Sequence, residues 1–350
     1  MTTTSPSSPS TLGDHPTGFA GFRRGWDGLA WTSRVVADPS SPELHERHAF
    51  VRVFTHASLY AFIVGVVAGF AAAIVGVTLH AWPLTALGGA LAAGGPIGAL
   101  VLAVRRRLRI GILHAGRAVV LGVLWGVIAF AAAFVIELLV ERGGNHTVAG
   151  FAFDGLVEEP LKLLLPVVLL ATGPALFKNP RVGVWMVVIA SGVFGMAEAA
   201  LYLADPVSAA STSGQTSAQI DAEVTAATGR LLVERMFVEI AHVIWTGGAA
   251  ALIWLGAHRA GRAFSWLGLL GFGIAVAQHV INDAVLTPID ATLLGGGTFL
   301  NLVWVILGYY FWFRPRVRQL VPPDAVALVP KRWRARMPRA LQRGASAGAL

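Results

Sequence analysis

The stretch Leu156-Val-Glu158-Glu159-Pro-Leu-Lys162-Leu-Leu-Leu-Pro-Val-Val-Leu-Leu170 sets two carboxylates and an ammonium in an otherwise apolar run. Apolar runs of this kind are typical of helices that cross a membrane. Each charge at the centre of such a helix costs about 2.5–3.5 kcal/mol on insertion scales. Three charges so close together therefore indicate a functional site, whose groups need partners from other helices.

The whole chain has the composition of a polytopic membrane protein. Of its 350 residues, 55% are hydrophobic and only 13% are charged, and the mean hydropathy is +0.65. About eight apolar runs are long enough to span a bilayer, at residues 57–80, 84–104, 116–140, 152–173, 182–204, 230–256, 264–287 and 294–313. Their polarity does not alternate, which favours helices over barrel strands. The predicted fold is all-α, a membrane helix bundle.

The basic residues predict the orientation of this bundle. Most of the 27 Lys and Arg residues fall in the two termini and in alternate connections between the runs, and basic residues collect on the cytoplasmic side. We therefore expect both termini to be cytoplasmic. Residues 1–56 form a partly disordered cytoplasmic segment, residues 57–313 the transmembrane domain and residues 314–350 a basic cytoplasmic tail.

Four other features of the sequence limit the possible functions. The basic cluster from Lys331 to Arg339 includes Trp333 and suits anionic lipid headgroups, although a solvated tail that only enforces topology explains it equally well. The chain has no cysteine, which excludes thiolate nucleophiles and Cys-ligated metals. Its formal charge of +8 belongs mostly to the cytoplasmic face, so no nucleic-acid partner is indicated. The outward-facing residues 205–229 are either a flexible lid or a linker.

Three further apolar runs carry ionisable groups at a depth similar to that of Glu158. These are Glu198 in the run 182–204; Arg235, Glu239 and His242 on one face of the run 230–256; and His279, Asn282 and Asp283 in the run 264–287. Taken singly, a buried His packs by hydrogen bonding, Glu239 faces headgroups, and Lys162 and Arg235 neutralise carboxylates. Taken together, the groups predict one site in the outer half of the membrane.

Four motifs in order give this part of the chain its resemblance to a known family. They are Glu158-Glu159-x-x-Lys162; Phe194-x-x-x-Glu198; the segment Arg235 to His242 followed by Trp245-Thr-Gly; and His279-x-x-x-Asp283. The sequence resembles the PrsW family of intramembrane proteases, which is related to the type II CAAX prenyl proteases and the Abi proteins. The resemblance covers residues 151–287, the expected protease core. The CAAX branch has His at the place of Glu198, so the PrsW branch fits better.

The resemblance implies peptide-bond hydrolysis, for which we expect Glu158 or Glu159 to activate water. His242 and His279 either stabilise the oxyanion or bind a metal, Asp283 orients His279, and Glu198 is a further ligand or acid. A Zn²⁺ site made of Glu198, His242 and His279 and a metal-free glutamate mechanism both stay open. Lys162, Phe194, Arg235 and Asn282 are supporting residues, and no organic cofactor is indicated.

The expected substrate follows from the depth of the site. A single-pass membrane protein would be cut near the outer surface of a bacterial plasma membrane, and PrsW relatives are associated with this first cut in anti-sigma factors. The principal alternative is an ion- or proton-coupled transporter that uses the buried Glu, His and Lys as a relay. No internal repeat supports a transporter, since the ionisable groups of the predicted site all lie in the four runs from 152 to 287, with no corresponding set in the three runs before them.

Overall fold

The computed structural model describes residues 13–16, 22–26, 31–37, 56–108, 110, 112–140, 148–204, 215–289 and 299–320. The chain divides into two units, one of Met1–Val53 with Arg318–Leu350 and one of Phe54–Val317. The second unit is built from helices and confirms the all-α class for the membrane region.

The first unit contains three short strands, which the sequence analysis did not anticipate. They are β1 (Gly13–Pro16), β2 (Phe22–Trp26) and β3 (Trp31–Ala37), paired antiparallel in the order β1-β2-β3. Strands β2 and β3 contain Trp, Phe and Val, which favour strands, whereas β1 is Gly-Asp-His-Pro. The basic cluster from Lys331 to Arg339 and the first twelve residues lie outside the described residues.

The helical unit follows the predicted apolar runs. Its helices are α2 (His56–Thr78), α3 (Trp82–Leu108), α4 (Ile112–Val140), α5 (Val148–Thr172), α6 (Ala175–Lys178), α7 (Pro180–Ala204), α8 (Ser217–Val238), α9 (Ile240–Ala260), α10 (Trp266–Ile281) with the π-helix η1 (Asn282–Leu286), and α12 (Phe299–Leu307) with η2 (Gly308–Phe313) and α13 (Arg314–Gln319).

Six helical stretches among the described residues are long and apolar enough to cross a membrane. They are Ala57–Thr78, Trp82–Leu108, Gly116–Val140, Pro180–Ala204, Ser217–Ala260 and Trp266–Ile289. Of the other two predicted runs, 152–173 falls on α5, and the described part of 294–313 falls on the α12–η2 segment. Helix α5 carries four charged residues, Asp154, Glu158, Glu159 and Lys162, and the α12–η2 segment changes helix type partway. The protein is an integral membrane protein with at least these six apolar helices.

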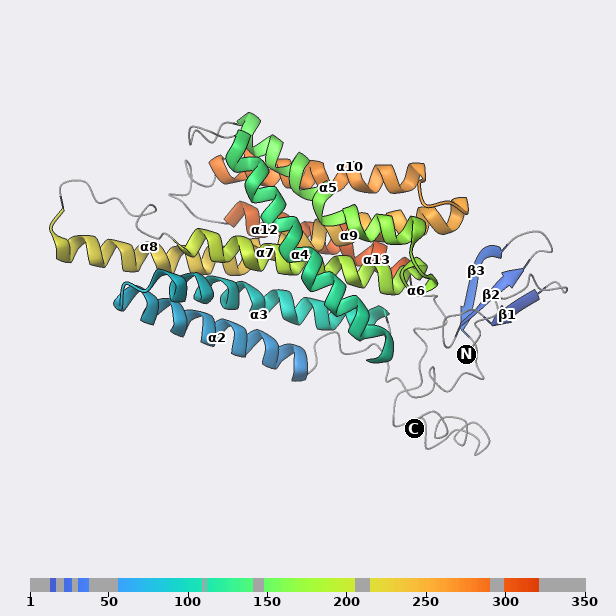
Figure 1. The fold of residues 1–350 in the computed structure, drawn as a ribbon, viewed down its shortest axis with the longest axis horizontal. Coiled ribbons are helices and arrows are strands. Elements are labelled where there is room, and N and C mark those ends of the chain that lie inside the picture. Colours follow the sequence, from blue (N-terminus) through green and yellow to red (C-terminus); the bar gives the residue numbers. More distant parts are fainter. Residues whose placement is uncertain are drawn as a thin grey trace. The chain divides into compact units, whose positions relative to one another are not determined.

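Helices α7 and α9 form the interior of the bundle. Packed neighbours follow one another in the order α2, α3, α7, α9 and α10, while α4 crosses obliquely and packs on α7 and α5 (Figure 1). Gly183 of α7 permits the closest approach to α9, because a Cβ there would overlap the Trp254 ring. Tryptophan side chains add hydrogen bonds between helices: Trp125 Nε1 of α4 donates to the Leu161 carbonyl of α5 at 2.9 Å. The interior is thus rigid around the helices that carry the predicted site.

Half of the predicted loop 205–229 is helical. Helix α8 begins at Ser217, where Thr216 and Gln219 form a reciprocal capping box, a combination that satisfies two otherwise unpaired donors. Helices α8 and α9 meet at Glu239, whose N–H bonds to the Arg235 carbonyl. Together they make one apolar stretch of 44 residues, Ser217–Ala260. Residues 205–214 lie outside the described residues.

Candidate active site

The three charged groups of α5 form a buried ion triplet. Lys162 Nζ donates to Glu158 Oε2 at 2.8 Å and to Glu159 Oε1 at 2.9 Å. Spacings of three and four residues put these side chains on one face of the helix. Lys162 and Glu159 are fully buried and Glu158 nearly so. One ammonium therefore serves two carboxylates, and the triplet keeps a net negative charge.

Lys162 also connects α5 to α9 and α7. Its Nζ lies 2.7 Å from His242 Nδ1 and 4.2 Å from the centre of the Phe194 ring. An ammonium can only donate hydrogen bonds, so Nδ1 of His242 is the acceptor and the imidazole proton is assigned to Nε2. Phe194 is thus a wall of the site, which accounts for its place in the second motif.

Glu159 is bonded through both of its oxygens. Besides Lys162, Oε1 lies 3.2 Å from His279 Nδ1, and Oε2 accepts from Thr246 Oγ1 at 2.7 Å. These donors come from three helices, α5, α9 and α10. Glu159 therefore ties these helices together, and each of its two oxygens already has a hydrogen-bond partner.

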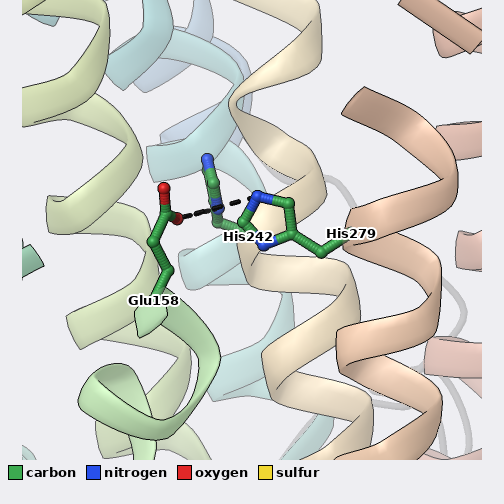
Figure 2. Close-up of side chains that lie close together, drawn as sticks. All are labelled: Glu158, His242 and His279. Atoms are coloured by element: carbon green, nitrogen blue, oxygen red, sulfur yellow. Dashed lines mark ion pairs between the residues drawn. The ribbon is translucent and has the colours of Figure 1, made fainter. Parts of the chain in front are cut away.

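Glu158 instead faces the two histidines. Its Oε2 lies 3.8 Å from His242 Nδ1 and 3.8 Å from His279 Nε2, and Figure 2 shows the carboxylate of α5 directed toward both rings. Among the residues that the structure describes, Oε1 of Glu158 makes no hydrogen bond or ion pair. Glu158 is thus the carboxylate of the pair that is open to a further ligand.

Asp283 contacts His279 at Nε2, the nitrogen that also faces Glu158. His279 Nε2 lies 2.8 Å from Asp283 Oδ2, and Asn282 Nδ2 donates to Asp283 Oδ1 at 2.7 Å. Asn282 and Asp283 belong to the π-helix η1, and π-bulges often occur at functional sites. Of the two polar neighbours, Asp283 contacts the histidine and Asn282 orients Asp283.

A second cluster lies at the other nitrogen of His242. Nε2 is 2.8 Å from Glu198 Oε2 and 3.2 Å from Glu239 Oε2. Arg235 Nη1 lies 3.1 Å from Glu239 Oε1 and 3.6 Å from Glu198 Oε1. His242 is therefore shared between two groups of acidic residues on opposite sides of its ring.

The structure brings all the sequence-predicted site residues into this one connected network: Glu158, Glu159, Lys162, Phe194, Glu198, Arg235, His242, His279, Asn282 and Asp283. Sequence reasoning quoted Thr246 only within the Trp245-Thr-Gly motif and gave it no role, although it stands four residues after His242 on the same helical face. It placed Glu239 on the polar face with Arg235 and His242, with the headgroups as the alternative, and gave it no role in the site; Glu239 is fully buried beside His242. Its spacing from Arg235 and His242 was the signal.

Two groups of described residues have ligand atoms close enough to hold a metal ion. They are Glu158, His242 and His279, and Glu198, Glu239 and His242; within each group the atoms lie within 4.8 Å of one another. The predicted set of Glu198, His242 and His279 is not one of them. The reason is that Glu198 contacts His242 at Nε2, whereas Glu158 lies at the opposite nitrogen, Nδ1. It is Glu158, not Glu198, that lies near both His242 Nδ1 and His279 Nε2.

The first group fits a zinc ion in two respects: the types of its ligands, and the carboxylates that contact its histidines. Two imidazoles and one carboxylate with an open fourth position are typical of catalytic zinc. The nitrogen of each histidine that faces away from Glu158 lies beside a carboxylate, Glu198 for His242 and Glu159 for His279, which is the usual outer-shell arrangement. Lys162 Nζ lies against two of the three donors, and Asp283 Oδ2 lies 2.8 Å from the third, His279 Nε2. An ion there therefore requires the ammonium to move and this histidine contact to break.

Comparison with known proteins agrees with the geometry. The sequence model of the PrsW-protease family, described as PrsW family intramembrane metalloprotease, matches residues 114–312. No curated protein matches the chain, and no solved structure does. The match covers more than half of the chain and includes every residue of the network described above. The protein therefore belongs to the PrsW family of intramembrane metalloproteases, and it is a PrsW-like peptidase of the membrane.

Proposed function

We propose that the protein cuts a single-pass membrane protein at a peptide bond near the outer surface of a bacterial plasma membrane. An anti-sigma factor or a similar regulator is the expected substrate. The distribution of Lys and Arg supports eight membrane crossings with both termini in the cytoplasm, which puts the site in the outer half of the bilayer. A topology reporter that places residues 205–229 in the cytoplasm would overturn this orientation.

The observation that carries the proposal is the position of Glu158 between His242 Nδ1 and His279 Nε2. Oε1 of Glu158 has no hydrogen bond or ion pair among the described residues, so it accepts the proton of the attacking water and returns it to the leaving amine. Asp283 holds His279 in place. The buried surroundings keep other water away from these groups.

Glu158, His242 and His279 would hold the zinc ion of the metalloprotease family. Bound there, the ion would supply Lewis-acid polarisation of the scissile carbonyl. Lys162 would keep Glu159 as a partner on leaving the other two donors, so its displacement would not leave a buried ammonium alone.

The test uses the full-length protein in nanodiscs with fluorogenic peptides that cover the transmembrane and juxtamembrane region of single-pass proteins. Glu158→Gln is expected to lower turnover by at least about 10³-fold. Glu223→Gln is the matched control, because Glu223 pairs only with the exposed Arg230 on α8. Cleavage that persists in Glu158→Gln would sink the assignment, whereas cleavage that survives a strong chelator would favour the metal-free glutamate mechanism.

A further inference from the structure

The two nitrogens of His242 face different surroundings. Nδ1 points to Lys162 and Glu158, where the proposed reaction takes place. Nε2 points to the two carboxylates of Glu198 and Glu239. Only one of the two nitrogens of a neutral imidazole has a lone pair free for the reaction, and the partner of the other nitrogen decides which one it is.

Arg235 holds both of those carboxylates. Its Nη1 lies 3.1 Å from Glu239 Oε1 and 3.6 Å from Glu198 Oε1, and its guanidinium carbon stacks 3.3 Å from the centre of the Tyr202 ring. A planar guanidinium keeps a fixed direction for each donor. With the Oε1 atoms turned toward Arg235, the Oε2 atoms of both glutamates face His242.

The buried oxygens on the histidine side have little else to contact. Among the described residues, Oε2 of Glu198 and Oε2 of Glu239 are buried and make no hydrogen bond, so their near polar neighbour is the imidazole Nε2. Gly195 allows this close arrangement, because a Cβ there would lie 2.9 Å from the Glu239 carbonyl oxygen and 3.1 Å from His242 Cδ2. Two carboxyl groups beside one imidazole nitrogen favour the tautomer with the proton on Nε2.

We infer that Arg235 is a positioning residue: through Glu198 and Glu239 it keeps the proton of His242 on Nε2 and the lone pair of Nδ1 directed at Glu158 and His279. This inference rests on the proposed function. It differs from simple charge neutralisation, for which any cation at this place would suffice. It also assigns Glu198 to orienting His242 rather than to binding metal.

The test follows the imidazole directly. Full-length protein with ¹⁵N-labelled histidine is reconstituted in nanodiscs without added metal, and His242 is assigned by its loss in His242→Gln. In the wild type, Nε2 is expected to give the signal of a protonated nitrogen and Nδ1 that of an unprotonated one. In Arg235→Gln this pattern is lost or averaged. In Arg235→Lys, which keeps the charge but loses the planar guanidinium stacked on Tyr202, it is recovered only in part.

Kinetics provide the second readout. Arg235→Gln is expected to lower kcat by about 10–100-fold with little change in KM, as for other outer-shell residues. Arg230→Gln makes the same charge change on the same helix, at an exposed pair with Glu223, and should alter neither readout. An unchanged His242 signal in a folded Arg235→Gln variant overturns the inference, as does full recovery by lysine. A wild type that cuts no peptide would refute the proposed function alone, because the nitrogen signals still test the positioning.

Discussion

Replacing Glu158 and Glu159 separately should show that Glu159 mainly stabilises the fold and that Glu158 mainly takes part in the reaction. Glu159 is fully buried and receives contacts from Lys162, His279 and Thr246, whereas Glu158 receives one hydrogen bond, from Lys162. Glu159→Gln keeps the shape but removes the charge and turns an amide N–H₂ toward donors. We expect Glu159→Gln to be the far less stable variant.

The magnitudes follow from the partners that each change leaves behind. Removing one member of a buried ion pair costs about 3–5 kcal/mol, which is the expectation for Glu159→Gln. Losing the charge on a single hydrogen bond costs about 1.5 kcal/mol, which is the expectation for Glu158→Gln, because the bond from Lys162 is the one hydrogen bond of Glu158 among the described residues. The predicted difference between the two variants is therefore about 1.5–3.5 kcal/mol in the free energy of unfolding.

The assay is reversible unfolding in mixed micelles of increasing SDS fraction, followed through the fluorescence of the 11 tryptophans. Turnover is measured in parallel under conditions in which both variants are folded. Glu158→Gln should be stable and inactive, and Glu159→Gln unstable with residual activity. Equal unfolding midpoints, or a Glu158→Gln variant that unfolds first, would refute the division of roles between the pair.

Three further changes probe the same network. Thr246→Val leaves Oε2 of Glu159 without its donor at 2.7 Å, and the free energy of unfolding should fall by about 1–3 kcal/mol in SDS titration. Gly195→Ala places a methyl group 3.1 Å from His242 Cδ2, so we expect an overpacking cost of about 1–3 kcal/mol in the same titration and a lower kcat. Lys162→Met removes the ammonium that lies against the proposed metal ligands. Added Zn²⁺ should therefore raise its free energy of unfolding, by about 2.7 kcal/mol at a concentration of one hundred Kd, which is measured as a higher thermal midpoint.

Each of these changes has its own control. Thr246→Ser keeps the hydroxyl and should restore most of the lost stability. Gly229→Ala, on a helix where a new Cβ meets nothing within 4 Å, should be neutral or slightly stabilising. A Lys162→Met variant whose thermal midpoint ignores Zn²⁺ would count against an ion held by Glu158, His242 and His279.

Much of the site could be predicted because charges are rare in this chain. Only 13% of the residues are charged, so each one inside an apolar helix needs a partner, and the partners of Glu158 had to be sought on the other helices with polar residues. This reasoning gave no role in the site to Thr246 or to Glu239, for different reasons. A threonine costs little in a helix, and a glutamate near a predicted helix start has a plausible place at the headgroups.

The long apolar helices could be predicted from the sequence, whereas the start of α8 and the three strands could not. Apolar length places a membrane helix well, and the described helices follow the runs. The capped start of α8 at Ser217 depends on Thr216 and Gln219, a local signal hidden in a stretch rich in small polar residues. The strands β1, β2 and β3 have no apolar length to reveal them, since their stability depends on pairing with one another.

The amino-acid sequence was enough to establish that this is a membrane helix bundle with a PrsW-type set of glutamates and histidines. That information lies in local composition and in spacing along single helices. Only the tertiary structure decided how the adjacent pair divides its work, because Glu158 and Glu159 are nearly identical in sequence context. Glu159 meets Thr246 and His279 from other helices, whereas Glu158 faces both histidines. The direction in which a side chain points from a helix has meaning only once its neighbours are in place.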